Sequence, residues 1–179
     1  MKKTHLLFVL VAALVLMGVT PLVADTFTYA YASTNGDGVT ASVYLADSVL
    51  SPGVDLITSG YIDINNGTGG GFTTGQIDLY LSPSPTGALQ YSPSGYFIYD
   101  NVLTPGADPV IDNGGLLFAD AGVEINLFSN GPGSYQLYQN NGYNDTGNMT
   151  ATPEPASMLL LGTAFFLAAG LLRRHLLVG

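Results

Sequence analysis

Short segments in which apolar and polar residues alternate, separated by turn residues, make up the body of this 179-residue chain. In residues 39–45, for example, the apolar side chains fall on one face and Thr40, Ser42 and Tyr44 fall on the other. This period of two is typical of a half-buried β-strand, and no window in the body keeps a helical spacing. We expect strands at Thr26–Tyr31, Val39–Leu45, Tyr61–Asn65, Gln76–Leu81, Tyr96–Tyr99, Leu116–Phe118, Val123–Phe128 and Ser134–Tyr138.

The stretches between these segments are rich in glycine, asparagine and proline, which form tight turns. They are too short for crossover helices, so the strands are expected to be antiparallel, with hairpins over residues 63–81 and 123–138. The sequence therefore predicts an all-β fold, with an antiparallel β-sandwich or jelly-roll-like body of about eight strands. An N-terminal signal helix and a C-terminal transmembrane helix are expected to flank this body.

The N-terminus has the parts of a secretory signal peptide. Two lysines at residues 2–3 precede an apolar run over residues 6–19. Cleavage after Ala24 is expected, and the tripeptide at residues 30–32 (Ala-Tyr-Ala) is the alternative site. Residues 1–24 are therefore assigned to a signal peptide that the Sec export machinery would read.

The C-terminus carries three features in a fixed order. These are the tripeptide Pro153, Glu154 and Pro155, the uncharged apolar run 156–172, and the basic pair Arg173 and Arg174. Proline fixes φ and lacks a backbone donor, so the tripeptide is expected to be extended and accessible. The apolar run is long enough for a short transmembrane helix, and the two arginines would act as a cytoplasmic stop.

This arrangement resembles the PEP-CTERM sorting signal of bacterial exported proteins. The resemblance implies that an exosortase, a membrane-embedded cysteine peptidase, recognises the tripeptide and removes the tail. It covers only residues 153–179, and residues 175–179 depart from it slightly because they continue past the arginines with mostly apolar side chains. A simple single-pass membrane anchor is the alternative interpretation.

The two ends divide the chain into four expected parts: a signal peptide (1–24), a β-sandwich body (25–144), a linker (145–152) and the sorting tail (153–179). Both basic clusters would stay in the cytoplasm, which places the body outside it. The expected precursor is anchored in the inner membrane through its C-terminal helix, and the mature form is at the cell surface or extracellular.

The chain has no positively charged side chain between residues 25 and 152. All four Lys and Arg and both His lie in the terminal segments, whereas twelve of the 13 acidic residues lie between them, which gives a formal charge of −12. Such a polyanion repels nucleic acid, which we therefore exclude as a partner. Divalent cations that bridge this surface to anionic exopolysaccharide are a partner hypothesis.

The same composition excludes most common catalytic groups, because the body has no imidazole, thiolate or amine that could act as a base or a nucleophile. Paired carboxylates, as in glycoside hydrolysis, are the remaining route, and Asp108, Asp112, Asp120 and Glu124 lie close together in the sequence. Glu124 alternates with apolar neighbours, so we expect it on the solvated face of a strand. The protein is therefore expected not to be an enzyme.

Several loops are rich in carboxylate, amide and carbonyl oxygens. Because such oxygens suit a hard cation, calcium is a possible bound ion. The weak candidates are Asp37, Asp108, Asp112 and Asp145. Their loops match neither an EF-hand nor a nonapeptide calcium repeat, and Asx-Gly runs are first of all turns. No other cofactor is expected.

All 11 tyrosines lie between the two ends of the chain. Most are expected in the core and in cross-strand pairs, since a platform for sugar rings would need several on one exposed face. The leading hypothesis is a non-enzymatic exported surface or matrix protein, sorted through its tail and associated with exopolysaccharide or biofilm. The alternative is a carbohydrate- or calcium-dependent binding module on the cell surface.

Overall fold

The computed structural model describes residues 26–67, 71–81 and 86–152, which are folded into eleven β-strands. Their bounds are β1 (Thr26–Ser33), β2 (Thr40–Ser51), β3 (Val54–Asn65), β4 (Gly75–Asp78), β5 (Gln90–Tyr91), β6 (Ile98–Tyr99), β7 (Val102–Leu103), β8 (Leu116–Asp120), β9 (Val123–Gly131), β10 (Ser134–Gln139) and β11 (Asn144–Ala151). Within these residues there is no helix that could cross a membrane.

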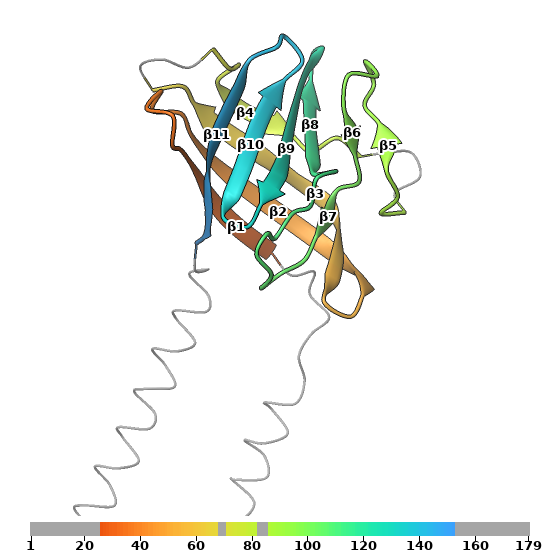
Figure 1. Cartoon of the computed structure of the whole chain (residues 1–179). Coiled ribbons are helices and arrows are strands. Elements are labelled where there is room, and N and C mark those ends of the chain that lie inside the picture. Colours follow the sequence, from red (N-terminus) through yellow and green to blue (C-terminus); the bar gives the residue numbers. More distant parts are fainter. Residues whose placement is uncertain (1–25, 68–70, 82–85, 153–179) are drawn as a thin grey trace, which may run out of the picture.

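Nine strands form one antiparallel sheet that curls back on itself (Figure 1). Their order is β4-β3-β2-β1-β11-β10-β9-β8, with β7 beside β3. Just after β4, Leu79 pairs with Phe118 of β8, and the Tyr80 amide donates to the carbonyl of Leu117 at 2.8 Å. The two ends of the sheet therefore meet, and the sheet is a nearly closed barrel.

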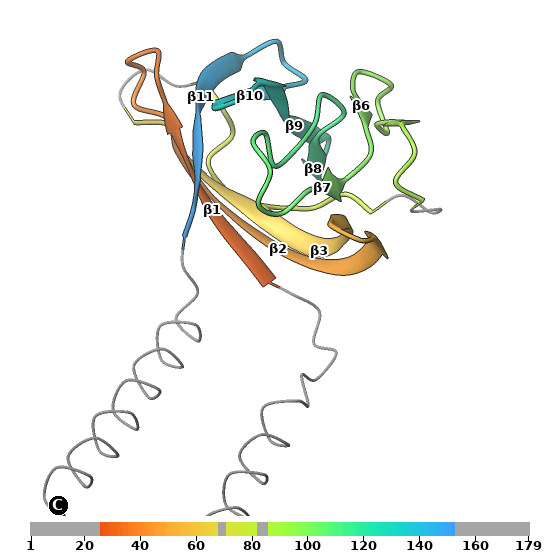
Figure 2. The ribbon, with the colours of Figure 1, turned by 60° about the horizontal axis from the view of Figure 1, so that its bottom comes forward.

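The predicted all-β antiparallel class is confirmed, and both predicted hairpins, β3–β4 and β9–β10, are present. The arrangement differs from the expected sandwich of two sheets, because β1 pairs with β2 on one side and with β11 on the other. One continuous sheet thus encloses the core, with β1–β3 facing β8–β10 across it (Figure 2). The expected signal and transmembrane helices lie outside the described residues.

The alternation that predicted the strands also predicts which side chains fill the barrel. Val39, Ala41, Val43 and Leu45 were expected to share one face, and all four are buried in the core cluster. Tyrosines 29, 31 and 135 join them there. Burial is the main cause that raises the pKa of Tyr29 to about 12.

The β5–β6 hairpin packs on the outside of the barrel. Phe97 and Tyr99 form a second apolar cluster with Leu117 of β8. The outward side chains of the strands beneath the hairpin are therefore covered. Leu117, for example, lies between two core residues of β8, so its side chain points away from the core. It nevertheless has no exposed surface, because the hairpin covers it.

The same cover corrects the prediction for Glu124. Its side chain is 4% exposed rather than solvated, because Ser94 in the β5–β6 turn lies over it. One carboxylate oxygen accepts a hydrogen bond from the Ser94 amide at 2.7 Å, and the other accepts one from the Ser94 hydroxyl at 2.5 Å. Glu124 thus attaches the hairpin to β9.

The predicted linker at residues 145–152 is also wrong, because these residues belong mostly to β11, which pairs with β1 and β10. Gly147 explains how this polar strand fits. A Cβ there would lie 2.3 Å from the Ala32 carbonyl oxygen and 2.6 Å from the Tyr31 ring, so only glycine leaves room for that ring. The folded body therefore reaches Ala151 rather than residue 144.

Candidate functional site

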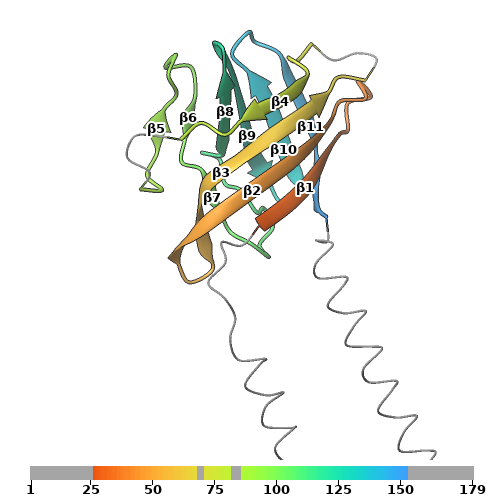
Figure 3. The same cartoon turned by 180° about the vertical axis from the view of Figure 1, so that it is seen from behind.

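The strands β1, β2, β3 and β4 lie side by side (Figure 3), and we call the polar surface formed by their outward side chains the outer face. It consists of the side chains that point away from the barrel core. The antiparallel register places Ala30 beside Ser42, Ser42 beside Asp63, and Asp63 beside Gln76. Four strands thus contribute to a single row of small and polar groups.

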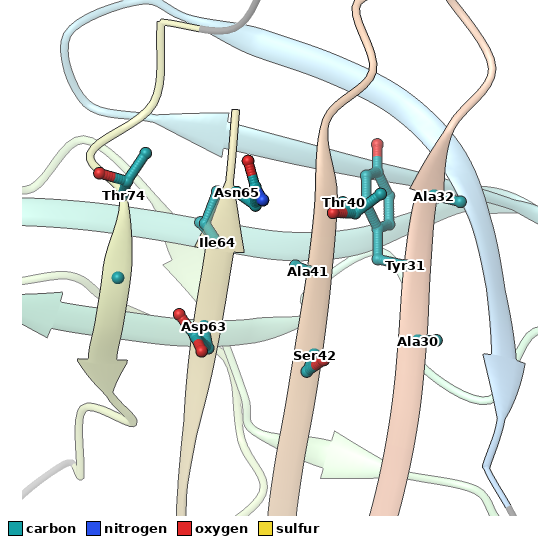
Figure 4. Close-up of a pocket in the computed structure, with 11 residues that line it drawn as sticks. Ala30, Tyr31, Ala32, Thr40, Ala41, Ser42, Asp63, Ile64, Asn65 and Thr74 are labelled. Carbon is teal, nitrogen blue, oxygen red and sulfur yellow. The ribbon is translucent and has the colours of Figure 1, made fainter. Parts of the chain in front are cut away.

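A second row, two residues further along each strand, contains Ala32, Thr40 and Asn65. Apart from Gln76, the side chains in both rows are short, so they leave a depression of about 730 Å³ that extends to Thr74 (Figure 4). Hydroxyl, amide and carboxylate groups line it, and Asp63 and Ser42 lie side by side within it.

A smaller depression of about 410 Å³ lies on the same face towards the other end of β1. Thr26, Thr28, Ala46 and Ser59 line it, and these side chains are again short. Each of these residues is two or four positions along its strand from a residue that lines the first depression. Since side chains two or four apart in a strand point to the same side, both depressions belong to one continuous face.

Tyr44 and Tyr61 line the smaller depression and lie on the row next to the larger one. They are cross-strand neighbours on β2 and β3, and their rings stack with centroids 4.6 Å apart and planes at 27°. Tyr44 is 38% exposed. Because the side chains on the neighbouring rows are mostly short, part of this aromatic pair remains exposed.

Polar groups border this tyrosine pair on the β4 side. Asp78 is the register partner of Tyr61, and its Oδ1 accepts a hydrogen bond from Gln76 Nε2 at 3.0 Å. Asp63 lies on the next row of the same face. Aromatic surface beside amide, hydroxyl and carboxylate groups can stack on the C–H side of a sugar ring and hydrogen-bond to its hydroxyls.

The four weak calcium candidates do not come together. Asp145 is fully buried, and its carboxylate accepts hydrogen bonds from the Tyr31 hydroxyl at 2.6 Å, Ser33 Oγ at 2.9 Å and Asn35 Nδ2 at 3.1 Å. Burial, together with this contact, raises the pKa of Tyr31. The Asp145 carboxylate is thus occupied by protein donors.

The remaining candidates lie in loops. Asp108 Oδ1 accepts from the Gly133 amide at 2.7 Å, and Asp37 is half-buried between β1 and β2. Asp112 Oδ1 accepts from the amides of Gly114 at 2.8 Å and of the following residue at 3.2 Å. In the part of the chain that the structure describes, no three acidic side chains form a group that could hold a metal ion.

Asp112 also contacts a carboxyl group that the sequence did not single out. Asp100 is 9% exposed, and burial raises its pKa to about 7, with the neighbouring Asp112 carboxyl acting in the same direction. Among the four carboxylates considered for hydrolysis, Glu124 is held by Ser94 and Asp120 is exposed at the end of β8. The carboxyl group that Asp112 contacts is thus that of Asp100, and not that of Asp120 or Glu124.

Sequence reasoning predicted that Ser42, Tyr44 and Asp63 point outward, but it did not group them into a site. The grouping depends on the strand order β4-β3-β2-β1, which no local pattern contains. One signal in the sequence could have suggested the site. The predicted strands over residues 39–45 and 61–65 each place a tyrosine on the polar side, together with a serine in the first strand and a carboxylate in the second.

Comparisons with known proteins leave this site to be judged on its own chemistry. No protein-family model matches the chain, and neither the curated proteins nor the solved structures gave a significant match. The expected sorting tripeptide, the arginine pair and the signal cleavage point at Ala24 lie outside the described residues.

Proposed function

We propose that this chain is an exported surface or matrix protein that binds extracellular polysaccharide without cleaving it. The observation that carries the proposal is the stacked Tyr44–Tyr61 pair, which lines the smaller depression and lies one row away from the larger, polar one. An extended surface of this kind suits a polymer better than a small molecule, which most often binds in an enclosed pocket.

Export and sorting are part of the same proposal, and the sequence supports them. The Sec machinery would take the chain across the membrane, and an exosortase-type peptidase would recognise Pro153-Glu154-Pro155. Cleavage after Ala24 suits the fold better than cleavage after Ala32, because the latter would remove most of β1, which pairs with two strands. The mature protein would then be released at the cell surface.

The absence of catalysis rests on composition. Residues 25–152 have no imidazole, thiol or amine, so an acid–base pair could be made only from carboxyl and tyrosine hydroxyl groups. On the outer face, Asp78 already accepts a hydrogen bond from Gln76. The proposal therefore assigns retention of polysaccharide, not its hydrolysis, to this face.

Co-sedimentation with the extracellular polysaccharide of the host organism tests this function. The full-length protein is kept soluble in a polyoxyethylene detergent, which has no sugar headgroup. We expect the wild type to sediment with the polymer and the Tyr44→Ala/Tyr61→Ala variant to lose about tenfold or more in affinity, since the variant lacks both ring surfaces.

Tyr91→Ala is the matched control, because Tyr91 is 72% exposed but lies on the β5–β6 hairpin. It should bind as the wild type does. Equal binding by the double variant, with its fold verified by circular dichroism, would remove the outer face from the proposal. Release of reducing sugar ends by the wild type would contradict the non-catalytic role.

A further inference from the structure

We infer that the outer face recognises an uncharged stretch of glycan, directly and without a bridging cation. This inference rests on the proposed function and names the class of its ligand. The alternative ligand is an anionic polysaccharide held through divalent ions, and the two require different chemistry on the face.

The charge on the face is the first argument. Asp63 and Asp78 are both exposed on it, and the chain has no cation between residues 25 and 152. A uronate or sulfate group that entered either depression would meet like charge without any guanidinium or ammonium group to offset it. The face therefore selects against an anionic sugar.

The placement of these two carboxylates is the second argument. The register pairs Asp63 with Gln76 and Asp78 with Tyr61, so the carboxylates lie diagonally on neighbouring strands rather than opposite each other. Asp78 Oδ1 is already occupied by the Gln76 amide. Calcium needs six to eight oxygen ligands. Two diagonal carboxylates, one of them partly occupied, do not supply them.

The remaining groups suit sugar hydroxyls. A carboxylate or an amide oxygen accepts from a hydroxyl, and the hydroxyls of Ser42 and Thr40 can donate or accept. These groups border the larger depression, and the stacked Tyr44–Tyr61 pair adjoins it. A neutral pyranose presents both hydroxyl edges and a C–H face, so it matches the two kinds of surface at once.

The small side chains of β1 leave room for a glycan to cross the strands. Ala30 and Ala32 lie beside Ser42 and Thr40 in the register and add no bulk above the sheet. The larger depression therefore extends across the strands from β1 to Thr74 and Gly75. A polymer segment that crosses the strands would place successive rings over this floor.

The test uses one polymer in two charge states. Binding of the full-length protein is measured to the host's extracellular polysaccharide before and after chemical reduction of its carboxyl groups to alcohols. Each form is tested in 0.05 M and 0.5 M NaCl, with and without EDTA. We expect the reduced polymer to bind at least as tightly as the native one, with no loss in EDTA or high salt, because uncharged ligands are not screened.

A charge-removal variant sharpens the result. Asp63→Asn/Asp78→Asn keeps one acceptor oxygen at each position and removes both charges, so affinity for the native polymer should rise about threefold or more in low salt. Affinity for the reduced polymer should change less than that for the native polymer.

Two results would overturn the inference in different ways. Loss of binding after carboxyl reduction or in EDTA, with native polymer still bound, would mean that the ligand is anionic and cation-bridged, while the proposed function stands. Failure to bind either form of the polymer would overturn both this inference and the proposed function.

Discussion

At the scale of single residues, the buried Asp100 should make stability depend on pH. Its pKa is raised from 3.8 to about 7 by burial, with Asp112 beside it. The folded state therefore binds more protons than the unfolded chain between these values, and the free energy of unfolding falls as the pH rises from about 4 to about 7. The loss is on the order of 2–4 kcal/mol.

Asp100→Asn should remove most of this slope. The asparagine keeps an oxygen that can accept from the Val102 amide, which donates to Asp100 Oδ1 at 3.1 Å, and its amide group can donate to Asp112. Urea unfolding at pH 5 and pH 8 checks this, with the variant more stable than the wild type at pH 8. The exposed Asp120→Asn is the control, and an unchanged slope in Asp100→Asn would contradict the assignment.

Gly147 offers a second residue-scale prediction. Gly147→Ala would place a methyl group against the Tyr31 ring and the Ala32 carbonyl, so the free energy of unfolding should fall by about 1–3 kcal/mol or more. Gly36→Ala is the comparison, because its Cβ meets nothing but its φ is +87°, which costs about 1 kcal/mol. Equal losses in the two variants would mean that the close packing of β11 on Tyr31 is not needed.

At the scale of elements, the β5–β6 hairpin depends on Glu124. Glu124→Ala would leave the Ser94 amide and hydroxyl without their acceptor, at a cost of about 1–3 kcal/mol. Because these bonds attach the hairpin to the barrel, amide hydrogen exchange should quicken over residues 90–99 more than in β1 or β2. Asp120→Ala, which removes an exposed carboxylate nearby, should leave exchange unchanged.

Uniformly faster exchange across the whole barrel in Glu124→Ala would contradict a local role for this contact.

The same hairpin shows where sequence patterns stop being informative. Alternation placed Glu124 on the outward side of its strand, which is where it lies, but only the tertiary structure shows that another element covers that side.

The strands themselves were predictable to the extent that their side chains alternate in size and polarity. β2 and β9 alternate clearly, and both were expected. β11 was not, because Asn144–Ala151 contains no large aliphatic residue other than Met149 and is held by Asp145 and Gly147 instead. β5 and β7 have two residues each, which is too short for any periodicity.

At the scale of the whole molecule, strand order places both ends of the described body side by side. β1 begins at Thr26, and the last residues of β11 pair with it, so that the Thr152 amide donates to the Thr28 carbonyl at 2.7 Å. The first and last described residues, Thr26 and Thr152, therefore lie at the same end of the barrel (Figure 1).

Removal of both terminal segments should leave this barrel intact. We expect the intact mass of the mature protein from its host to correspond to a chain that begins after Ala24 and ends near Pro153-Glu154-Pro155. Replacement of that tripeptide by three alanines should keep the full C-terminus and hold the protein in the membrane fraction. A mature wild-type protein that retains residues 156–179 would make it a simple anchored protein.

The strand order also creates the site, since Ser42, Asp63 and Gln76 come from three different strands. Sequence patterns predicted that the first two point outward, but which strands are neighbours is a property of the closed sheet. The unusual charge, by contrast, could be read directly from the sequence.

The most direct test of this account is a map of where the glycan binds. Two-dimensional amide NMR spectra of the full-length protein in detergent would be recorded during titration with oligosaccharides cut from the bound polysaccharide. The shifted signals should belong to the outer face around Tyr44, Tyr61 and Asp63. Shifts confined to the β5–β6 hairpin around Tyr91 would contradict it.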